Sequence, residues 1–184
     1  MGILDIFREK ESNDKNGMDT ELIENYGDNV REFDLNIEKI LENWENYHAI
    51  REIIANALDE QIITKTRDIE IKQSNDGWWH IVDYGRGLNY HHLTQNENEE
   101  KLSNDKLIGR FGVGLKDALA TLYRHNVKVK IKSKYGTITL KTASKVGFED
   151  IITLHAEIAP TNDTYMVGTD FCLYGLSLIH ISEP

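Results

Sequence analysis

The chain has 184 residues, 40% of them hydrophobic and 28% charged, which is the composition of an ordinary globular domain with one core. Its formal net charge of −10 excludes a general affinity of the whole surface for nucleic acid. Its single cysteine excludes an internal disulfide, and no apolar run approaches the roughly 20 residues that span a bilayer, so we expect a cytoplasmic protein that does not enter a membrane.

The N-terminal part of the chain is polar and gives way to a helical pattern. Residues 9–29 are rich in asparagine, aspartate and other charged side chains, which is typical of a mobile arm or a loose linker. We therefore predict an arm over 1–34 and one folded domain over 35–175. Helical periodicity predicts a helix over about 35–60, with a break near Asn46.

Two stripes of different character run along the second half of this predicted helix. At about 100° of rotation per residue, one face collects the apolar side chains of Ile50, Ile53, Ile54 and Ala57. The nearly opposite face carries Glu52, Asn56 and Asp59. The pattern alone leaves two interpretations open, namely the solvated face of an amphipathic helix and a row of polar groups in a binding site.

A β-hairpin is predicted next, because the Asp-Gly pair at 76–77 lies between two β-rich runs at 68–73 and 78–83. The second run ends in a carboxylate that is followed by two glycines, in the order Asp83, Gly85 and Gly87. The carboxylate is therefore expected at the end of a strand, with a flexible turn behind it.

A second glycine cluster follows a polar loop over 88–108. The place of this loop between two glycine motifs favours a functional lid, and simple disorder is the alternative. The cluster opens a helical pattern and pairs glycine amides with a lysine, as a phosphate site does, in the run Gly109, Arg110, Phe111, Gly112, Val113, Gly114, Leu115, Lys116. The P-loop is excluded because Lys116 does not follow Gly114 directly, and a Rossmann fingerprint is excluded because its third glycine is missing.

Lysines alternate with apolar residues in the strand-like segment that follows. The alternation places four lysines on one face, at Lys128, Lys130, Lys132 and Lys134. It is typical of the solvated outer face of a sheet, and a basic stripe for nucleic-acid phosphates is the alternative.

Cys172 lies in an apolar run and is interpreted as a buried, inert thiol. The pair His91-His92 lacks partners at metal-binding spacing and is interpreted as loop polarity.

In order and spacing, these motifs resemble those of the GHKL ATPases, which include gyrase B subunits, the ninety-kilodalton heat-shock chaperone, histidine kinases and MutL. The first motif of that family, Glu-x-x-x-Asn-x-x-Asp, is matched by Glu52, Asn56 and Asp59. The second, Asp-x-Gly-x-Gly, is matched by Asp83, Gly85 and Gly87. The glycine-rich run at 109–116 resembles the third motif and Gly168-Thr169 resembles the fourth, so the resemblance covers about 46–175.

The resemblance implies a Bergerat ATP-binding domain, which is an α/β two-layer sandwich with a mixed, mostly antiparallel sheet and helices on one face. It implies ATP and Mg²⁺ as ligands, with Asn56 giving its side-chain oxygen to the metal and Glu52 activating the attacking water. Asp83 would accept a hydrogen bond from the adenine amino group, with Thr169 supporting it. Lys116 and the amides of the glycine-rich run would neutralise the phosphates and so take part in catalysis.

The expected function is Mg²⁺-dependent ATP binding and hydrolysis that drives a conformational switch. A histidine-kinase-type phosphotransfer module and a non-catalytic nucleotide sensor are the alternatives. Glu52 and Asp59 favour hydrolysis, because histidine kinases usually lack the glutamate and carry a basic residue in place of the aspartate. Glu60 departs from the small residue common after that aspartate, so the subfamily stays open, as does the choice between DNA, a client protein and a signalling partner.

The last residues of the chain, 176–184, resemble the translation of a sequencing adapter, so we expect the native protein to continue after Gly175. Members of the family usually carry a transducer domain at this point, which contributes a lysine to the γ-phosphate. Without that domain the chain is expected to bind ATP and to hydrolyse it slowly. A nucleotide-dependent dimer is compatible with the resemblance.

Overall fold

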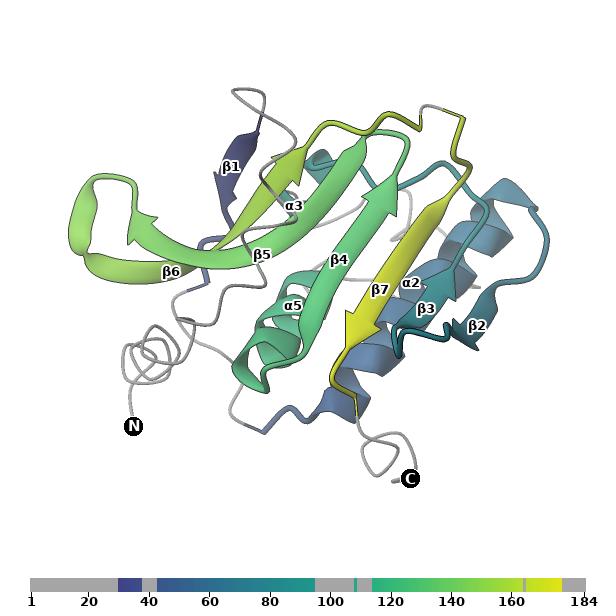
Figure 1. The fold of residues 1–184 in the computed structure, drawn as a ribbon, viewed down its shortest axis with the longest axis horizontal. Coiled ribbons are helices and arrows are strands. Elements are labelled where there is room, and N and C mark those ends of the chain that lie inside the picture. The colour runs from purple at the N-terminus through teal and green to yellow at the C-terminus, as the bar shows by residue number, and fades with distance from the viewer. Residues whose placement is uncertain (1–29, 38–42, 95–107, 109–113, 164, 177–184) are drawn as a thin grey trace.

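A computed structural model describes residues 30–37, 43–94, 108, 114–163 and 165–176. They form an α/β arrangement in which helices pack against a seven-stranded open sheet (Figure 1). Every pair of neighbouring strands in these ranges is antiparallel. The expectation of a mostly antiparallel sheet with helices is therefore confirmed, and the parallel pairs of a mixed sheet are not found in the described ranges.

The order of strands across the sheet is β1-β6-β5-β4-β7-β3-β2. In chain order they are β1 (Arg31–Asp34), β2 (Glu70–Gln73), β3 (Trp79–Val82), β4 (Lys128–Ser133), β5 (Gly136–Lys145), β6 (Phe148–Ala159) and β7 (Thr169–Tyr174). The last strand, β7, lies between β4 and β3. It therefore joins the early hairpin to the later three strands.

Three helices are described: α2 (Asn46–Thr64), the single turn α3 (His91–Thr94) and α5 (Gly114–Arg124). Figure 1 shows α2 and α5 behind the central strands, where they cover the same face of the sheet. Apolar side chains from this face and from the two helices form one core, which includes Ile53, Leu119, Leu122, Ile131, Leu154 and Leu173. In the described ranges, no helix combines the length and the apolar character that a membrane crossing requires.

The predicted hairpin is confirmed. Strands β2 and β3 pair with Gln73 opposite Trp79, and the turn between them contains Gly77 with a φ of 90°. The Ser74 carbonyl accepts a hydrogen bond from the Gly77 N–H at 3.0 Å, which closes the turn. The positive φ explains the glycine at this position, because other residues rarely adopt that conformation.

The helix predicted over about 35–60 is wrong at its beginning and starts at Asn46, where the break was expected. Leu35 bonds instead to β6, and Asn36 adopts a φ of 54° while its N–H donates to the Asp34 carboxylate at 2.7 Å. Such local side-chain bonds compete with helix formation. In addition, four residues assigned to the polar arm form β1, which pairs with β6.

The lysine-bearing strand has one buried and one open face. Val129 and Ile131 of β4 are buried in the core, whereas Lys128 is exposed and Lys130 and Lys132 are partly exposed. The lysines therefore lie on the sheet face opposite the helices. This placement agrees with a solvated outer face, the first of the two interpretations given above.

Candidate functional site

Four sequence segments that carry the polar and glycine motifs meet at one end of the helix-covered face. They are the later turns of α2, the loop after β3, the first turn of α5 and the beginning of β7. Specific contacts join these segments. Together they show that residues far apart in the chain line one region.

The strand-end carboxylate of Asp83 is only 4% exposed and is held by two partners. It accepts a hydrogen bond from the Gly85 N–H at 2.9 Å and another from the Thr169 hydroxyl. Burial raises the pKa of Asp83, the negative charge of Glu60 adds to that rise, and the hydrogen bonds from Gly85 and Thr169 offset only part of it. The result is a fixed acceptor with a desolvated carboxyl group.

Thr169 connects β7 to the loop that follows the aspartate. Its backbone carbonyl accepts from the Asp83 N–H at 3.0 Å, and its Oγ1 accepts from the Leu88 N–H at 3.0 Å. The preceding residue, Gly168, has a φ of 78°, and a Cβ there would overlap the Asp83 carbonyl. This glycine is therefore required both by the backbone conformation and by the close approach of the two segments.

Glu52 lies against the first turn of α5. Its side chain is 21% exposed, and one of its oxygens accepts from Arg51 at 3.1 Å. A Cβ at Gly114 would overlap the Glu52 carboxylate, so the glycine permits this contact between helices. One turn along α2, the Asn56 amide nitrogen donates to the Glu52 carbonyl at 2.8 Å, which fixes the orientation of the Asn56 amide.

The first turn of α5 brings further charges to Glu52. Burial raises the pKa of Asp117, Lys116 opposes this rise, and Glu52 adds to it. The carboxylates of Glu52 and Asp117 and the ammonium of Lys116 therefore act on one another at this turn. Leu115 is buried in the core. The first five residues of the predicted glycine-rich run, 109–113, which include Gly109, Gly112 and Val113, lie outside the described residues.

Asp59 is fully buried, and its Oδ1 accepts from the Ile108 N–H at 2.7 Å. Ile108 is the last residue of the predicted lid, whose first residue, Leu88, is bound by Thr169. Both ends of that loop are therefore attached to the site. The residues between, 95–107, lie outside the described part of the chain, and the lid stays a prediction.

An ion pair that sequence reasoning missed joins α2 to the loop of the second motif. Glu60 accepts from the Arg86 backbone N–H at 2.8 Å and from its guanidinium at 2.9 and 3.0 Å. Burial works to raise the pKa of Glu60, but the bonds from Arg86 outweigh it and lower that pKa overall. A Cβ at Gly85 would overlap the Glu60 side chain, so the loop also packs closely here.

The only sign of the Glu60–Arg86 pair in the sequence was that Glu60 departs from the GHKL motif, and this departure did not identify Arg86 as the partner. Ser133 was missed as well. Its hydroxyl donates to the Leu88 carbonyl at 2.7 Å, so β4 helps to hold the loop after Gly87. Gly87 itself has a φ of 85°, consistent with its predicted place in a turn.

Comparison with known proteins adds one relative. No protein-family profile matches the chain. A protein of Mycoplasma pneumoniae, described as uncharacterized, is 46% identical over 125 residues, and the match covers 66% of this chain and 50% of that protein. The chain therefore spans about half the length of the curated relative it matches.

Proposed function

We propose that the chain binds ATP with Mg²⁺ and hydrolyses it as a GHKL-type conformational switch. The observation that carries the proposal is the convergence of four motif segments through independent contacts: Glu52 with Gly114, Asp59 with Ile108, Glu60 with Arg86, and Asp83 with Thr169. The antiparallel sheet with α2 and α5 on one face supports the finer fold assignment, a two-layer sandwich of the histidine kinase-like ATPase type.

In this proposal the adenine is selected by Asp83. A carboxylate held by Gly85 and Thr169 presents an acceptor that suits the exocyclic amine of adenine and would face a carbonyl in guanine. Gly87 and Gly168 keep the neighbouring backbone free of side chains. Base selection therefore rests on a group that takes no part in the chemical step.

The phosphates are assigned to the first turn of α5. The helix N-terminus supplies partial positive charge, and Lys116 adds a full one. Asn56 offers an amide oxygen, which is a ligand type that Mg²⁺ accepts, and the carboxylates of Glu52 and Asp117 add negative charge at the same turn. When bound, Mg²⁺ would neutralise phosphate charge.

Glu52 is assigned to activation of the attacking water. Its carboxylate lies at the first turn of α5, where the terminal phosphate is expected, and it is partly exposed and so within reach of water. This position favours hydrolysis over phosphotransfer and over a purely sensory role. We propose that hydrolysis by this chain is slow and takes place in the cytoplasm.

Calorimetry tests base selection directly. For the wild-type chain with Mg²⁺, we expect ATP to bind more tightly than GTP. The Asp83→Asn variant should lose ~1.5–3 kcal/mol of ATP affinity, the usual contribution of a hydrogen bond to a charged group. Asp150→Asn is the matched control, because Asp150 is exposed on β6. Equal affinity of the wild type for ATP and GTP would contradict the assignment of Asp83.

A further inference from the structure

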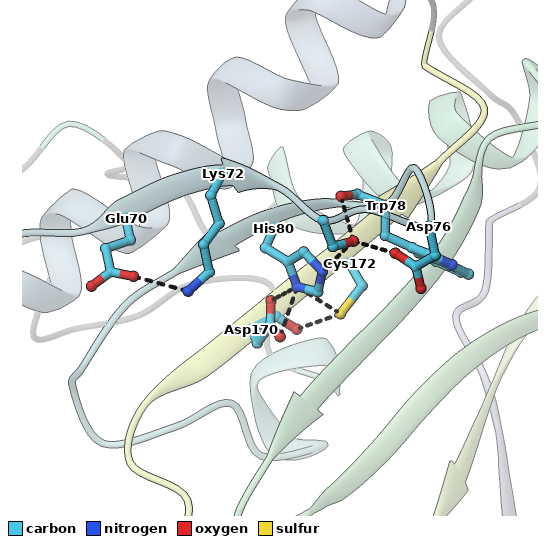
Figure 2. A network of polar contacts seen from close by, with 8 residues as sticks. Glu70, Lys72, Asp76, Trp78, His80, Asp170 and Cys172 are labelled. Atoms are coloured by element: carbon cyan, nitrogen blue, oxygen red, sulfur yellow. Dashed lines mark hydrogen bonds and ion pairs between the residues drawn. The ribbon is translucent and has the colours of Figure 1, made fainter.

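The open face of the sheet carries a second group of chemically capable side chains, on the side away from the proposed nucleotide site. His80 projects from β3, and Asp170 and Cys172 project from β7, two residues apart on one face. The strands pair with His80 opposite Cys172. Figure 2 shows the imidazole, the carboxylate and the thiol pointing toward one another.

The ligand atoms of these three side chains all lie within 4.8 Å of one another. His80 Nδ1 is 3.0 Å from each Asp170 carboxylate oxygen and 3.7 Å from Cys172 Sγ. Tetrahedral Zn²⁺, with bonds of about 2.0 Å to nitrogen and oxygen and about 2.3 Å to sulfur, would separate N from O by about 3.3 Å and N from S by about 3.6 Å. The two distances to the imidazole nitrogen therefore fit with adjustments of a few tenths of an ångström. The Asp170 carboxylate and the Cys172 sulfur, which lie within 4.8 Å of each other, would move together toward the separation of about 3.5 Å that tetrahedral coordination gives.

The imidazole is also oriented as a metal ligand would be. Its other nitrogen, Nε2, lies 3.3 Å from Ser74 Oγ, and that hydroxyl is itself bonded to Asp76 and, at 3.1 Å, to the Trp78 carbonyl. An outer partner on the second ring nitrogen fixes the tautomer and leaves Nδ1 to coordinate. Figure 2 shows this chain of contacts from the hairpin turn to the imidazole.

Positive charge nearby is the main argument against a cation here, because Lys130 and Lys132 lie opposite Cys172 and Asp170 across the strand pair. Lys72 pairs with Glu70 at 3.1 Å, and the Lys130 ammonium lies 5.1 Å from the centre of the Trp78 ring. A thiolate and a carboxylate together would balance the charge of a divalent ion.

We propose that His80, Asp170 and Cys172 form a binding site for a divalent transition metal of the zinc class, with the fourth position open to water. A nitrogen, an oxygen and a sulfur ligand suit Zn²⁺ and do not suit Mg²⁺ or Ca²⁺, which prefer oxygen. The side chains of His80 and Asp170 are 18% and 15% exposed, so the ion can enter from the open face. The site is separate from the proposed ATP site.

Cobalt titration tests the proposal on the reduced, metal-free chain. Thiolate coordination to Co²⁺ gives a charge-transfer absorption band in the near ultraviolet, and Cys172 is the only cysteine that can produce it. We expect one equivalent of Co²⁺ to develop the band, Zn²⁺ to remove it by displacement, and Mg²⁺ to leave it unchanged. If the wild-type chain shows no charge-transfer band with Co²⁺, the proposal is overturned, and no variant is needed to decide it.

Substitutions assign the ligands. Cys172→Ser should abolish the band, and His80→Ala should weaken Co²⁺ binding at least about tenfold, the lower limit for loss of even an outer partner. His91→Ala, on α3, is the matched control and should bind Co²⁺ as tightly as the wild type does. If His80→Ala does not fold, Ser74→Ala should still weaken binding by about tenfold or more. Unchanged Co²⁺ affinity in folded His80→Ala or Ser74→Ala would refute the site.

Asp83→Asn separates this inference from the proposed nucleotide function. The variant should lose ATP affinity and keep the cobalt band, because Asp83 faces the other side of the sheet from the proposed ligands. Loss of the band in a folded Asp83→Asn variant would contradict an independent metal site.

Discussion

At the scale of single residues, the proposed roles of Glu52 and Asn56 differ in the step at which each acts. Glu52→Gln keeps the shape of the side chain against Gly114 but removes the base. We expect hydrolysis to fall by ~10²–10⁴-fold, the usual contribution of general base catalysis, with ATP affinity nearly unchanged. Asn56→Ala should instead weaken Mg²⁺-dependent ATP binding, because a metal ligand acts in the ground state as well.

Single-turnover kinetics and calorimetry on the same preparations would compare the two variants. If Glu52→Gln loses ATP binding as completely as Asn56→Ala, Glu52 holds the structure and is not the base. Glu149→Gln provides a control, since Glu149 is exposed on β6.

The Glu60–Arg86 pair predicts a pH-dependent stability. The pKa of Glu60 is lowered from its ordinary value of 4.5, so its stabilising effect is fully present above about pH 4.5 and disappears as the pH falls through the folded-state pKa. Glu60→Gln should therefore lower the free energy of unfolding by about 0.5–1 kcal/mol at pH 7, the upper range for a partly exposed pair, and by less at pH 3, which lies below the ordinary pKa of 4.5. Urea unfolding at both values would measure this, and an equal loss at both would show that packing alone is responsible.

At the scale of elements, the contact between β7 and the loop after β3 depends on Gly168. Gly147 is a matched control, because both glycines have similar φ values, 78° and 82°, but a Cβ at Gly147 meets nothing within 4 Å. We expect Gly147→Ala to lower the free energy of unfolding by about 1–2 kcal/mol, because alanine is strained at this positive φ. Gly168→Ala should lower the free energy of unfolding by more than Gly147→Ala does. It should also weaken ATP binding, since the added Cβ displaces Asp83.

Thermal unfolding and ATP calorimetry would separate these two effects. In a domain of this size, each 1 kcal/mol shifts the melting temperature by roughly 2–4 °C. Equal melting temperatures for the two alanine variants would mean that the backbone at Gly168 relaxes without strain.

At the scale of the whole molecule, one prediction concerns the end of the chain, for which the structure describes residues up to Leu176. This residue packs, partly buried, against the core, whereas 177–184 lie outside the described residues. The resemblance of 176–184 to an adapter translation predicts that deletion of 177–184 leaves the melting temperature unchanged, because a segment of that origin would not have been selected to pack. Deletion of 176–184 should lower it by no more than roughly 2–4 °C, the shift for about 1 kcal/mol. Differential scanning calorimetry on both truncations decides this, and a large loss on removing 177–184 would show a native structural element.

Local chemistry was enough to predict several elements from the sequence. Asp-Gly at 76–77 specifies the hairpin, and the alternation of lysines in β4 specifies which of its faces is open. These patterns depend on a few neighbouring residues, so they can be interpreted without knowing how the rest of the chain folds. The candidate site residues were predicted from motif order, and contacts in the structure join several of them, namely Glu52 with Gly114 and Asp83 with Gly85 and Thr169.

Only the tertiary structure decided which distant segments meet. Four residues of the expected arm form β1 because they pair with the edge of β6. No local sequence pattern predicts this pairing. Likewise, Glu60 contacts Arg86 because α2 packs beside the loop after β3, and His80 contacts Asp170 and Cys172 because β7 pairs with β3. Turn chemistry and periodicity fix local conformation, whereas the pairing of distant strands is set by burial of the common core, and that is a property of the whole fold.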